Sequence, residues 1–257
     1  MDPRVEVHRT EGVDVLTLTD STGRNVLSLR MRRLLLDSLG EALHDDSCRA
    51  VVLTGASGNF CAGGDVREMN IESKEEASQR LELVHEIIRL IVCGPKPVVA
   101  AIPGIAAGGG ISLLAGCDHV VASPHARFTA SFLRTGVLPD MGALWAVSQR
   151  MGLAHARRFF TLGATLPAEQ AQRAGLVDTV VAASELISES VRVARDLTQI
   201  APLTFSAFKQ AFASHASTFE AALEAERQTQ PSLVTSNDHK ESVAAFLQKR
   251  QPTFSGT

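Results

Sequence analysis

Two short apolar runs rich in β-branched residues stand out along the chain, and a glycine-rich segment follows each. The runs occupy residues 50–54 (Ala-Val-Val-Leu-Thr) and 97–102 (Pro-Val-Val-Ala-Ala-Ile). Runs of this length are typical of strands buried in a sheet. The glycines lie within residues 55–64 and 108–110, and each group precedes a stretch with helical character, at 66–69 and 111–115. The pattern predicts the same unit twice: a buried strand, a glycine-rich turn and a helix start.

Alternation and helical spacing predict the elements around these two units. Residues 5–8 and 13–18 alternate apolar and polar side chains on either side of a Glu-Gly pair, which predicts a β-hairpin. Apolar residues recur at helical spacing over 29–43 and 74–91, which predicts two helices. The second helix should bury one face. That face carries Leu81, Val84, Ile88 and Ile91.

Strands and helices continue to alternate up to about residue 181, and only helices are predicted after that. The expected strands are 118–122, 126–129 and 176–181, and the expected helices are 143–151, 168–174, 185–199, 203–212, 219–228 and 239–249. Strands that alternate with helices favour an α/β fold with a parallel sheet. We expect a core at 1–200 and a helical C-terminal region at 201–257, available for packing between subunits.

Composition excludes several classes of protein. The 257 residues are 45% hydrophobic and 21% charged, with a net charge of −3. This balance argues against nucleic-acid binding, although a local basic cluster could still hold a ligand phosphate. No apolar run reaches the ~18 residues of a membrane span. The N-terminal residues lack the apolar core of a signal peptide, so we expect a cytoplasmic protein with no membrane partner.

The cysteines and histidines do not suggest a metal centre. The four cysteines include no Cys-x-x-Cys pair, which favours free thiols over a zinc site or a disulfide framework. The eight histidines are scattered without the spacing of metal ligands. We therefore expect no bound metal.

The glycine-rich turns are candidate ligand sites. Glycine lacks a Cβ, so another molecule can approach the backbone closely at Gly108, Gly109 and Gly110. A helix N-terminus also carries unpaired N–H groups and the positive end of the helix dipole, which attract negative charge. The same glycines would equally suit a tight turn that only lets two elements pack. Two such turns that converge, however, would present two N–H donors to one oxygen, as an oxyanion hole does.

Several motifs in order resemble those of the enoyl-CoA hydratase/isomerase (crotonase) superfamily. They occupy residues 60–69 (Phe-Cys-Ala-Gly-Gly-Asp-Val-Arg-Glu-Met), 96–110, 116–118 (Gly-Cys-Asp), 136–140 (Gly-Val-Leu-Pro-Asp) and 171–178 (Ala-Gln-Arg-Ala-Gly-Leu-Val-Asp). The match covers about the first 200 residues. The resemblance implies a crotonase-like ββα-superhelix core that binds acyl-CoA. It also implies a C-terminal helical region used in a homotrimer or a dimer of trimers.

The resemblance also implies a ligand and the residues that hold it. The ligand is a coenzyme A thioester, which is the substrate, and no separate cofactor is implied. The thioester oxygen would accept hydrogen bonds from the amides of Gly64 and Gly109, which would stabilise an enolate. Arg67 would lie near the CoA phosphates. Further contacts are expected from Asn25, Val26, Ala62, Asp65 and Gly108.

The sequence departs from the hydratases of this superfamily at two positions. Those enzymes use two glutamates to position and activate water. Ser112 and Phe132 occupy the corresponding places here. Neither side chain titrates near neutral pH, so neither can replace the missing general base. Hydration by the two-glutamate route is therefore not expected.

Asp140 is the remaining candidate base. Several isomerases of the superfamily carry an aspartate at this place that moves a proton along the acyl chain. Its apolar neighbours Leu138, Pro139 and Met141, together with Phe132 and Trp145 in an apolar pocket, should raise the pKa of Asp140 by removing water. The hypothesis is that Asp140 removes a proton, the oxyanion hole holds the dienolate, and the proton returns elsewhere. Asp140 could also simply cap the following helix.

Other functions remain open from the sequence. Hydration could use an altered residue set. Asp140 could act as a nucleophile, as in the dehalogenase of the superfamily, although that route wants an extra base and only His85 is loosely available. The chain could also bind acyl-CoA without turnover. The acyl group and the chain length remain open.

Overall fold

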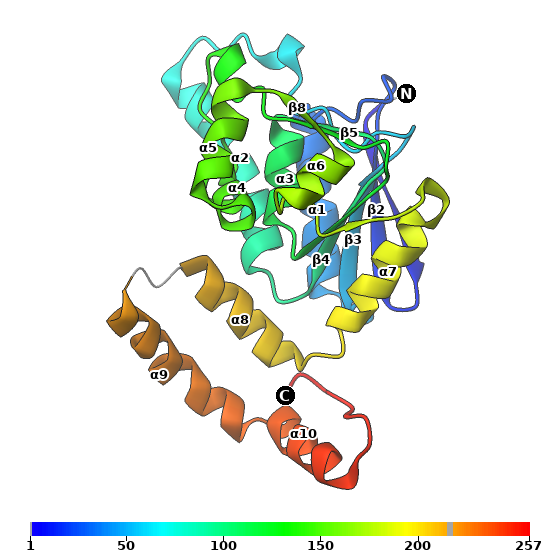
Figure 1. Cartoon of the computed structure of the whole chain (residues 1–257), viewed down its shortest axis with the longest axis vertical. Helices are drawn as coiled ribbons and strands as arrows, with labels where there is room; N and C mark the ends of the chain where they lie inside the picture. Colours follow the sequence, from blue (N-terminus) through cyan, green and yellow to red (C-terminus); the bar gives the residue numbers. More distant parts are fainter. Residues whose placement is uncertain (1, 215–217) are drawn as a thin grey trace.

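A six-stranded sheet runs through the centre of the molecule (Figure 1). The computed structural model describes residues 2–214 and 218–257. The strand order is β1 (Arg4–Thr10), β2 (Val13–Thr19), β3 (Ala50–Gly55), β4 (Val98–Ile102), β6 (His119–Ala122) and β9 (Thr179–Val180). β1 and β2 form the expected antiparallel hairpin, and the other neighbours are parallel. The predicted α/β class with a parallel sheet is therefore confirmed.

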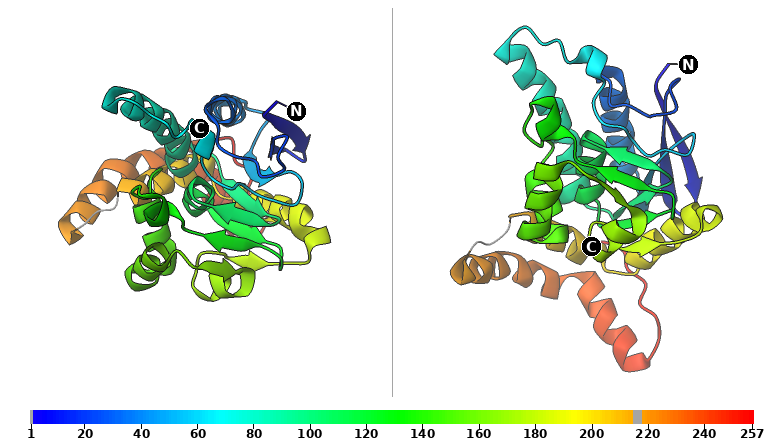
Figure 2. Two further views of the ribbon diagram at one scale, coloured as in Figure 1. Left: turned by 90° about the horizontal axis from the view of Figure 1, so that it is seen from above. Right: turned by 45° about the horizontal axis from the view of Figure 1, so that its top comes forward.

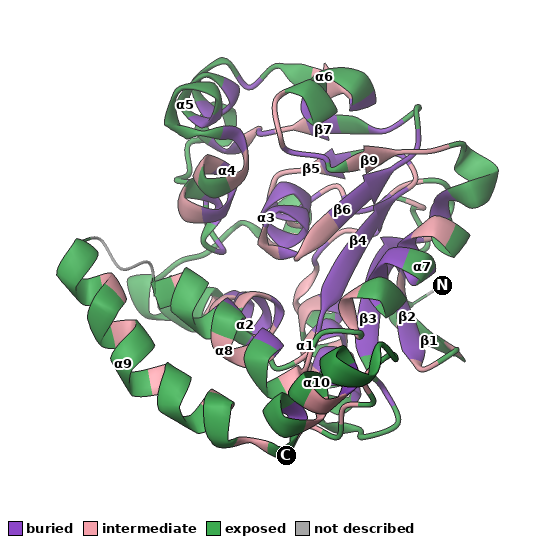
Figure 3. Ribbon diagram, turned by 60° about the horizontal axis from the view of Figure 1, so that its bottom comes forward, coloured by how far each residue is buried: buried purple, intermediate pink, exposed green. Residues whose placement is uncertain are grey.

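The central strands are buried on both faces because helices cover each side. Every residue of β3 and β4 is buried (Figure 3). One face packs against α1 (Leu29–His44), α2 (Lys74–Cys93) and α3 (Gly109–Gly116). The other face packs against α7 (Leu186–Leu197). The continuous apolar runs of the sequence follow from this double burial.

A smaller three-stranded sheet lies beside the second glycine turn. It consists of β5 (Ile105–Ala107), β7 (Arg127–Thr129) and β8 (Thr165–Pro167), with β7 in the middle. The sequence pattern predicts only β7. β5 and β8 are three residues long, too short for a period-2 pattern, so their pairing partners define them rather than their own residues.

The helices of the core agree with the sequence pattern, with three differences. α4 (Ala143–Met151) and α6 (Ala168–Arg173) lie where expected, whereas the pattern does not predict α5 (Leu153–Leu162). The expected helix at 66–69 is a single 3₁₀ turn, Val66–Glu68. On α2, Ile87 is buried and Leu81 is 39% exposed, so the buried face is rotated slightly from the prediction. Two further 3₁₀ turns span Phe132–Thr135 and Ala183–Glu185.

The C-terminal region is helical, as predicted, and extends away from the sheet (Figure 2). α8 (Pro202–Ser214) packs against α2, and α9 (Phe219–Thr235) and α10 (Asn237–Gln248) follow. α9 has no buried residue. None of the helices in the described part of the chain is long and apolar enough to cross a membrane.

Candidate functional site

The two glycine turns meet through backbone hydrogen bonds. The Phe60 and Cys61 amides donate to the Ile105 carbonyl at 3.0 and 3.1 Å, and the Ala107 amide donates to the Cys61 carbonyl at 2.9 Å. Cys61 and Ala106 form an isolated parallel bridge. The turn after β3 is therefore tied to the segment that leads into α3.

Only glycine fits where the turns come closest. A Cβ at Gly63 would lie 2.8 Å from the Ala107 carbonyl oxygen and 3.1 Å from the Gly109 nitrogen. A Cβ at Gly110 would lie 2.3 Å from the Cys61 carbonyl oxygen. Gly63 also has a φ of +90°, in the left-handed region that side chains rarely adopt. The glycines therefore serve close packing, and the same packing brings residues 63–64 beside residues 108–109.

Two backbone amides at this junction are unpaired. Among the described residues, neither the Gly64 nor the Gly109 N–H donates to a protein acceptor. Gly109 is the first residue of α3, where helix geometry leaves N–H groups without an internal partner. Gly108 precedes it as the N-cap, with a φ of +49°. The arrangement offers two donors on adjoining turns.

Asp140 lies at the same end of α3. Its carbonyl accepts hydrogen bonds from the Ser112 hydroxyl at 3.1 Å and from the Ala143 amide at 3.0 Å. Met141 is buried, and its sulfur lies 3.5 Å from where a Cβ on Gly109 would be. The backbone of Asp140 is thus fixed next to the turn that carries the Gly109 amide.

Asp140 is exposed at the surface of the single chain, and the protein around it partly shields its carboxylate from water. Removal of water by the surrounding protein raises the pKa of Asp140, against a lowering effect from the nearby charges of Arg32 and His85. The direction agrees with the expectation from the sequence. Of the apolar neighbours expected there, Met141 and Pro139 are buried, but Leu138 is 71% exposed.

Five of the predicted ligand residues line one open cavity of about 450 Å³. They are Val26, Ala62, Gly64, Asp65 and Arg67. Two arginines, Arg24 and Arg67, also give this cavity a basic rim. The Arg67 guanidinium is engaged with the Asp65 carboxylate, at 2.9 Å from Nε and 2.6 Å from Nη2, which lowers the pKa of Asp65. The cavity is adjacent to the unpaired Gly64 amide.

The prediction that Asn25 contacts the ligand does not fit the structure. Asn25 is fully buried, and its Nδ2 lies within hydrogen-bond distance of the Ala56, Asn59 and Phe60 carbonyls. Its side chain therefore holds the turn after β3 in shape and cannot reach a ligand. The sequence alone could not distinguish a residue behind the turn from one on its open surface.

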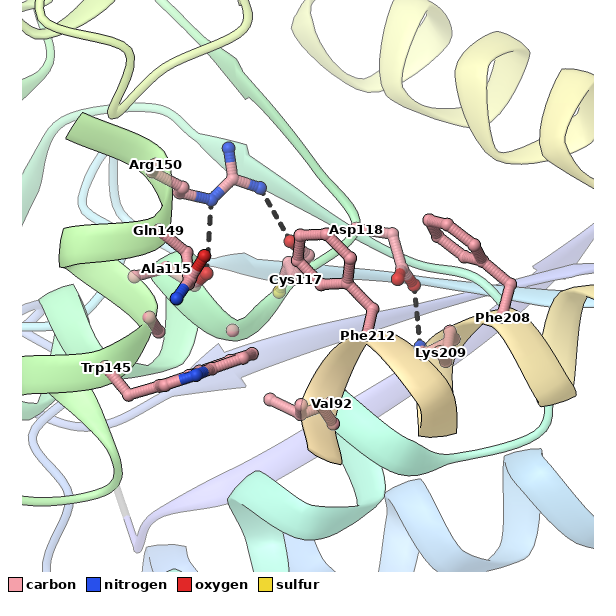
Figure 4. Close-up of a pocket in the computed structure, with 13 residues that line it drawn as sticks. Val92, Ala115, Cys117, Asp118, Trp145, Gln149, Arg150, Phe208, Lys209 and Phe212 are labelled. Atoms are coloured by element: carbon pink, nitrogen blue, oxygen red, sulfur yellow. Dashed lines mark hydrogen bonds and ion pairs between the residues drawn. The ribbon is translucent and has the colours of Figure 1, made fainter. Parts of the chain in front are cut away.

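Trp145 and Phe132 also differ from the expectation of a shared apolar pocket. Trp145 lines a separate cavity of about 290 Å³ between the C-terminal end of α3 and α8, opposite Phe208 and Phe212 (Figure 4). Phe132 is buried and packs edge-on against Phe160, with ring centroids 6.3 Å apart. Trp145 is therefore placed away from the glycine junction, and Phe132 contributes to the core.

Arg32 is a residue at the junction that the sequence reasoning missed. It lies on α1, half-buried, and its Nε donates to the Leu27 carbonyl at 2.8 Å. Its Nη2 would be 3.5 Å from a Cβ on Gly64. Arg32 stands three positions before the buried Leu35, so it lies on the apolar face of its helix. A charged residue at such a position is the sequence signal that could have identified it.

The described residues contain no group of three or more His, Cys, Asp or Glu side chains that could hold a metal ion. His215 lies outside those residues. The four cysteines are free thiols, of which only Cys93 is exposed. Asp118 is engaged by the Lys209 ammonium and the Val98 amide, which is a structural arrangement away from the glycine junction.

Comparison with known proteins relates the whole chain to acyl-CoA enzymes. A family model described as enoyl-CoA hydratase/isomerase matches residues 8–257. The chain is 34% identical over 254 residues to the 1,2-epoxyphenylacetyl-CoA isomerase of Escherichia coli K12, covering 97% of each chain. It is 33% identical to the 2,3-dehydroadipyl-CoA hydratase of the same organism, covering 97% of this chain and 98% of the relative. The crystal structure of an enoyl-CoA hydratase from Polaromonas sp. JS666 superposes with a TM-score of 0.90 at 32% identity, covering 98% and 100% of the two chains.

Proposed function

Because the chain belongs to the enoyl-CoA hydratase/isomerase family, we propose that this enzyme moves a carbon–carbon double bond along the acyl chain of a coenzyme A thioester. Its substrate class is an enoyl-CoA whose double bond is not conjugated with the thioester. The observation that carries the proposal is the junction itself, where two glycine amides without a protein acceptor lie at the end of α3 to which the backbone of Asp140 is tied.

The proposed role of the glycine amides is to hold the thioester oxygen. In the reaction, a proton leaves the carbon between the carbonyl and the double bond, and the electron pair delocalises onto the thioester oxygen as a dienolate. N–H donors aimed at that oxygen stabilise the charge as it forms, and one such donor is worth about 3 kcal/mol in the transition state. Gly64 and Gly109 provide one donor each.

The proposed role of Asp140 is to carry the proton. The carboxylate accepts the proton from the α-carbon of the substrate, and the same carboxylic acid returns it to the γ-carbon of the dienolate. The double bond then lies next to the thioester, and no atom is gained or lost. Partial removal of water from Asp140 makes its carboxylate a stronger base than one in bulk water, which supports this role.

The open cavity beside Gly64 is proposed to take the CoA moiety. Its backbone-lined wall and the rim of Arg24 and Arg67 suit a ligand that carries phosphates. Arg67 would divide its hydrogen bonds between Asp65 and the ligand. The assembly proposed for the enzyme is a homotrimer or a dimer of trimers, with contacts made by the C-terminal helices.

The isomerase is favoured over a hydratase by the two substituted positions. Ser112 is fully buried and donates to the Asp140 carbonyl, and Phe132 packs in the core. Neither can deprotonate water. The two-glutamate route requires carboxylates at these two positions, and the sequence has none there.

The test is turnover of a 3-enoyl-CoA by the wild type and by Asp140→Asn. Formation of the conjugated 2-enoyl thioester is followed by its ultraviolet absorbance. We expect activity in the wild type and a loss of roughly 10²- to 10⁴-fold in Asp140→Asn, because Asn cannot accept the proton. The affinity for a saturated acyl-CoA, measured by calorimetry, should change little.

Three outcomes would contradict the proposal. Formation of a 3-hydroxyacyl-CoA from a 2-enoyl-CoA would indicate hydration by other residues. Release of free CoA with an acyl-enzyme at Asp140 would indicate nucleophilic chemistry. Binding of acyl-CoA without any turnover would indicate a binding protein.

A further inference from the structure

Arg32 is a half-buried cation beside the glycine junction that pairs with no carboxylate among the described residues. An arginine side chain has five N–H donors, and in Arg32 one of them makes a hydrogen bond among the described residues. This is the Nε–H, which donates to the Leu27 carbonyl at 2.8 Å. Within that part of the chain, no carboxylate oxygen lies within 4.0 Å of the guanidinium. A charge that is partly removed from water normally has a partner, because burial without one is costly. Arg32 therefore requires an explanation.

The position of Arg32 is fixed by the same residues that shape the junction. Leu27 accepts the Nε hydrogen bond through its carbonyl, and a Cβ on Gly109 would lie 3.0 Å from its side chain. The guanidinium of Arg32 extends to the Gly64 side, where Nη2 would be 3.5 Å from a Cβ on that glycine. Met141, which follows Asp140, packs on Gly109. Arg32 thus lies on the Gly64 side of the pair of glycines, and the backbone next to Asp140 lies on the Gly109 side.

The charged groups that act on the two side chains are few. Burial lowers the pKa of Arg32, while the charges of Asp140 and Glu68 raise it and that of Arg80 lowers it. Asp140 is the largest of these charge effects, and Glu68 already accepts a hydrogen bond from the Leu29 amide at 2.7 Å. The nearby Cys61 thiol stays protonated, since burial raises its pKa to about 12.

On the Asp140 side, the opposing charges are Arg32 first and His85 second, and both lower the pKa of the carboxyl against the effect of burial. His85 lies on α2 and Arg32 on α1, so the two act from different helices. An arginine stays protonated throughout the working range of pH, whereas a histidine does not. Only Arg32 supplies a permanent positive charge.

We propose that Arg32 is a positioning residue whose charge, held near Asp140 without a direct ion pair, keeps that carboxylate ionised and available as the base when acyl-CoA covers the site. This inference rests on the proposed function of Asp140. A direct bidentate pair would occupy the carboxylate oxygens that must take the proton. A separated charge stabilises the anion and leaves both oxygens free. The positive charge thus opposes the effect of burial, which raises the pKa of Asp140.

The main test is the pH dependence of kcat/KM for isomerisation in the wild type, Arg32→Met and Arg32→Lys. Removal of the charge removes an effect that lowers the pKa of Asp140, so the carboxylate fraction at a given pH falls. In the profile of kcat/KM against pH, we expect the acid limb of Arg32→Met to lie about one pH unit higher than that of the wild type. At a pH below this limb, kcat/KM should be about tenfold lower than in the wild type. Arg32→Lys, which restores the charge, should recover most of the shift.

The matched control is Arg33→Met, which removes the same charge from an exposed position on α1. Its acid limb should coincide with that of the wild type. Each measurement is repeated in the His85→Gln background, so that the effect of the His85 side chain is separated from that of Arg32. An Arg32→Gln variant replaces Arg32→Met if the latter is insoluble.

A second readout does not depend on activity. The ¹³C resonance of the Asp140 carboxyl, assigned by its absence in Asp140→Asn, is titrated in the wild type and in Arg32→Met. A higher midpoint in Arg32→Met supports the inference even if no enoyl-CoA is turned over, in which case only the proposed function fails. Equal midpoints, or equal acid limbs with a lower kcat, would overturn the inference and leave Arg32 a packing residue.

Discussion

A methyl group added at Gly110 would push apart the two glycine-rich turns that form the candidate site. A Cβ added there would lie 2.3 Å from the backbone oxygen of Cys61, a clash that no side-chain rotation can relieve. We therefore expect Gly110→Ala to lower the melting temperature and to reduce isomerase activity at least tenfold, because the Gly64 and Gly109 amides would no longer adjoin. Gly40→Ala is the control. Gly40 has open space around it in α1, and alanine there should stabilise the helix by up to about 1 kcal/mol.

A second prediction at this scale concerns the stability of the Asp140→Asn variant. A carboxyl whose pKa is raised in the folded state binds its proton more tightly there than in the unfolded chain. The free energy of unfolding therefore falls as the pH rises from the pKa of Asp140 in the unfolded chain, near 3.9, to its higher pKa in the folded protein. At a pH above both pKa values, the folded protein carries the full free-energy cost of an ionised Asp140. An asparagine at this position carries no charge and has no such cost. We expect Asp140→Asn to unfold at an equal or higher temperature than the wild type at pH 7 to 8, and a clear decrease would contradict this sign.

Individual residues differ in how far the sequence could place them. The glycines and Asp140 lie in contiguous motifs, where spacing alone indicates a turn and the residue types indicate a use. Asn25 and Arg32 depend on the direction of one side chain relative to distant backbone. Asn25 turns inward to three carbonyls and Arg32 turns toward Gly64, and neither direction is encoded locally.

Among the elements, α8 buries two side chains, Phe205 and Lys209, and the lysine ties the helix to the core through its ammonium group. The Lys209 ammonium donates to the Ile91 carbonyl at 2.8 Å and the Lys96 carbonyl at 3.1 Å. It also donates to the Asp118 carboxylate at 2.7 Å, the contact marked in Figure 4. All three of its protons are therefore satisfied. The contact joins α8 to the end of α2 and to the strands β4 and β6.

We expect Lys209→Met to destabilise the protein by roughly 3 to 5 kcal/mol, since it leaves the carboxylate of Asp118 without its cation. Burial already raises the pKa of Asp118, and loss of Lys209 should raise it further. Urea denaturation followed by circular dichroism measures the change. The double variant Lys209→Met, Asp118→Asn should recover part of the loss, and no recovery would mean that packing of α8, not charge, was lost.

Length explains which elements the sequence predicted. The helices α1 and α2 span 16 and 20 residues, so several apolar repeats define each face. β5 and β8, which were not predicted, have three residues each and are defined by their pairing with β7, whereas the short β9 falls within the strand expected at 176–181. The 3₁₀ turn at Val66–Glu68 has the composition of a helix start but ends after one turn.

For the molecule as a whole, the C-terminal helices carry apolar surface that the single chain does not cover. Phe246 and Leu247 on α10 are 83% and 75% exposed, and Phe208, Phe212 and Phe219 are more than half exposed. Side chains of this kind, left in water on a protruding arm, are consistent with contacts between subunits.

We expect the wild type to sediment as three or six chains and the double variant Phe246→Glu, Leu247→Glu to sediment mainly as single chains. Two like charges on an apolar contact surface would have to be desolvated for the chains to associate. Analytical ultracentrifugation over a range of concentrations gives the mass. Lys240→Glu on the same helix is the matched control and should leave the assembly intact. A wild type that sediments as one chain would remove the basis for the prediction.

The sequence by itself predicted most of the strands and helices and the two glycine turns, and its resemblance to a known family indicated Asp140 as the candidate base. These depend on local periodicity and on residues that are close in the chain, which a linear pattern records. The tertiary structure decided which backbone amides remain unpaired, which side chains face the junction and which charges act on Asp140. Those properties arise where segments meet that are distant in the chain, and the geometry of such a meeting exists only in the folded protein.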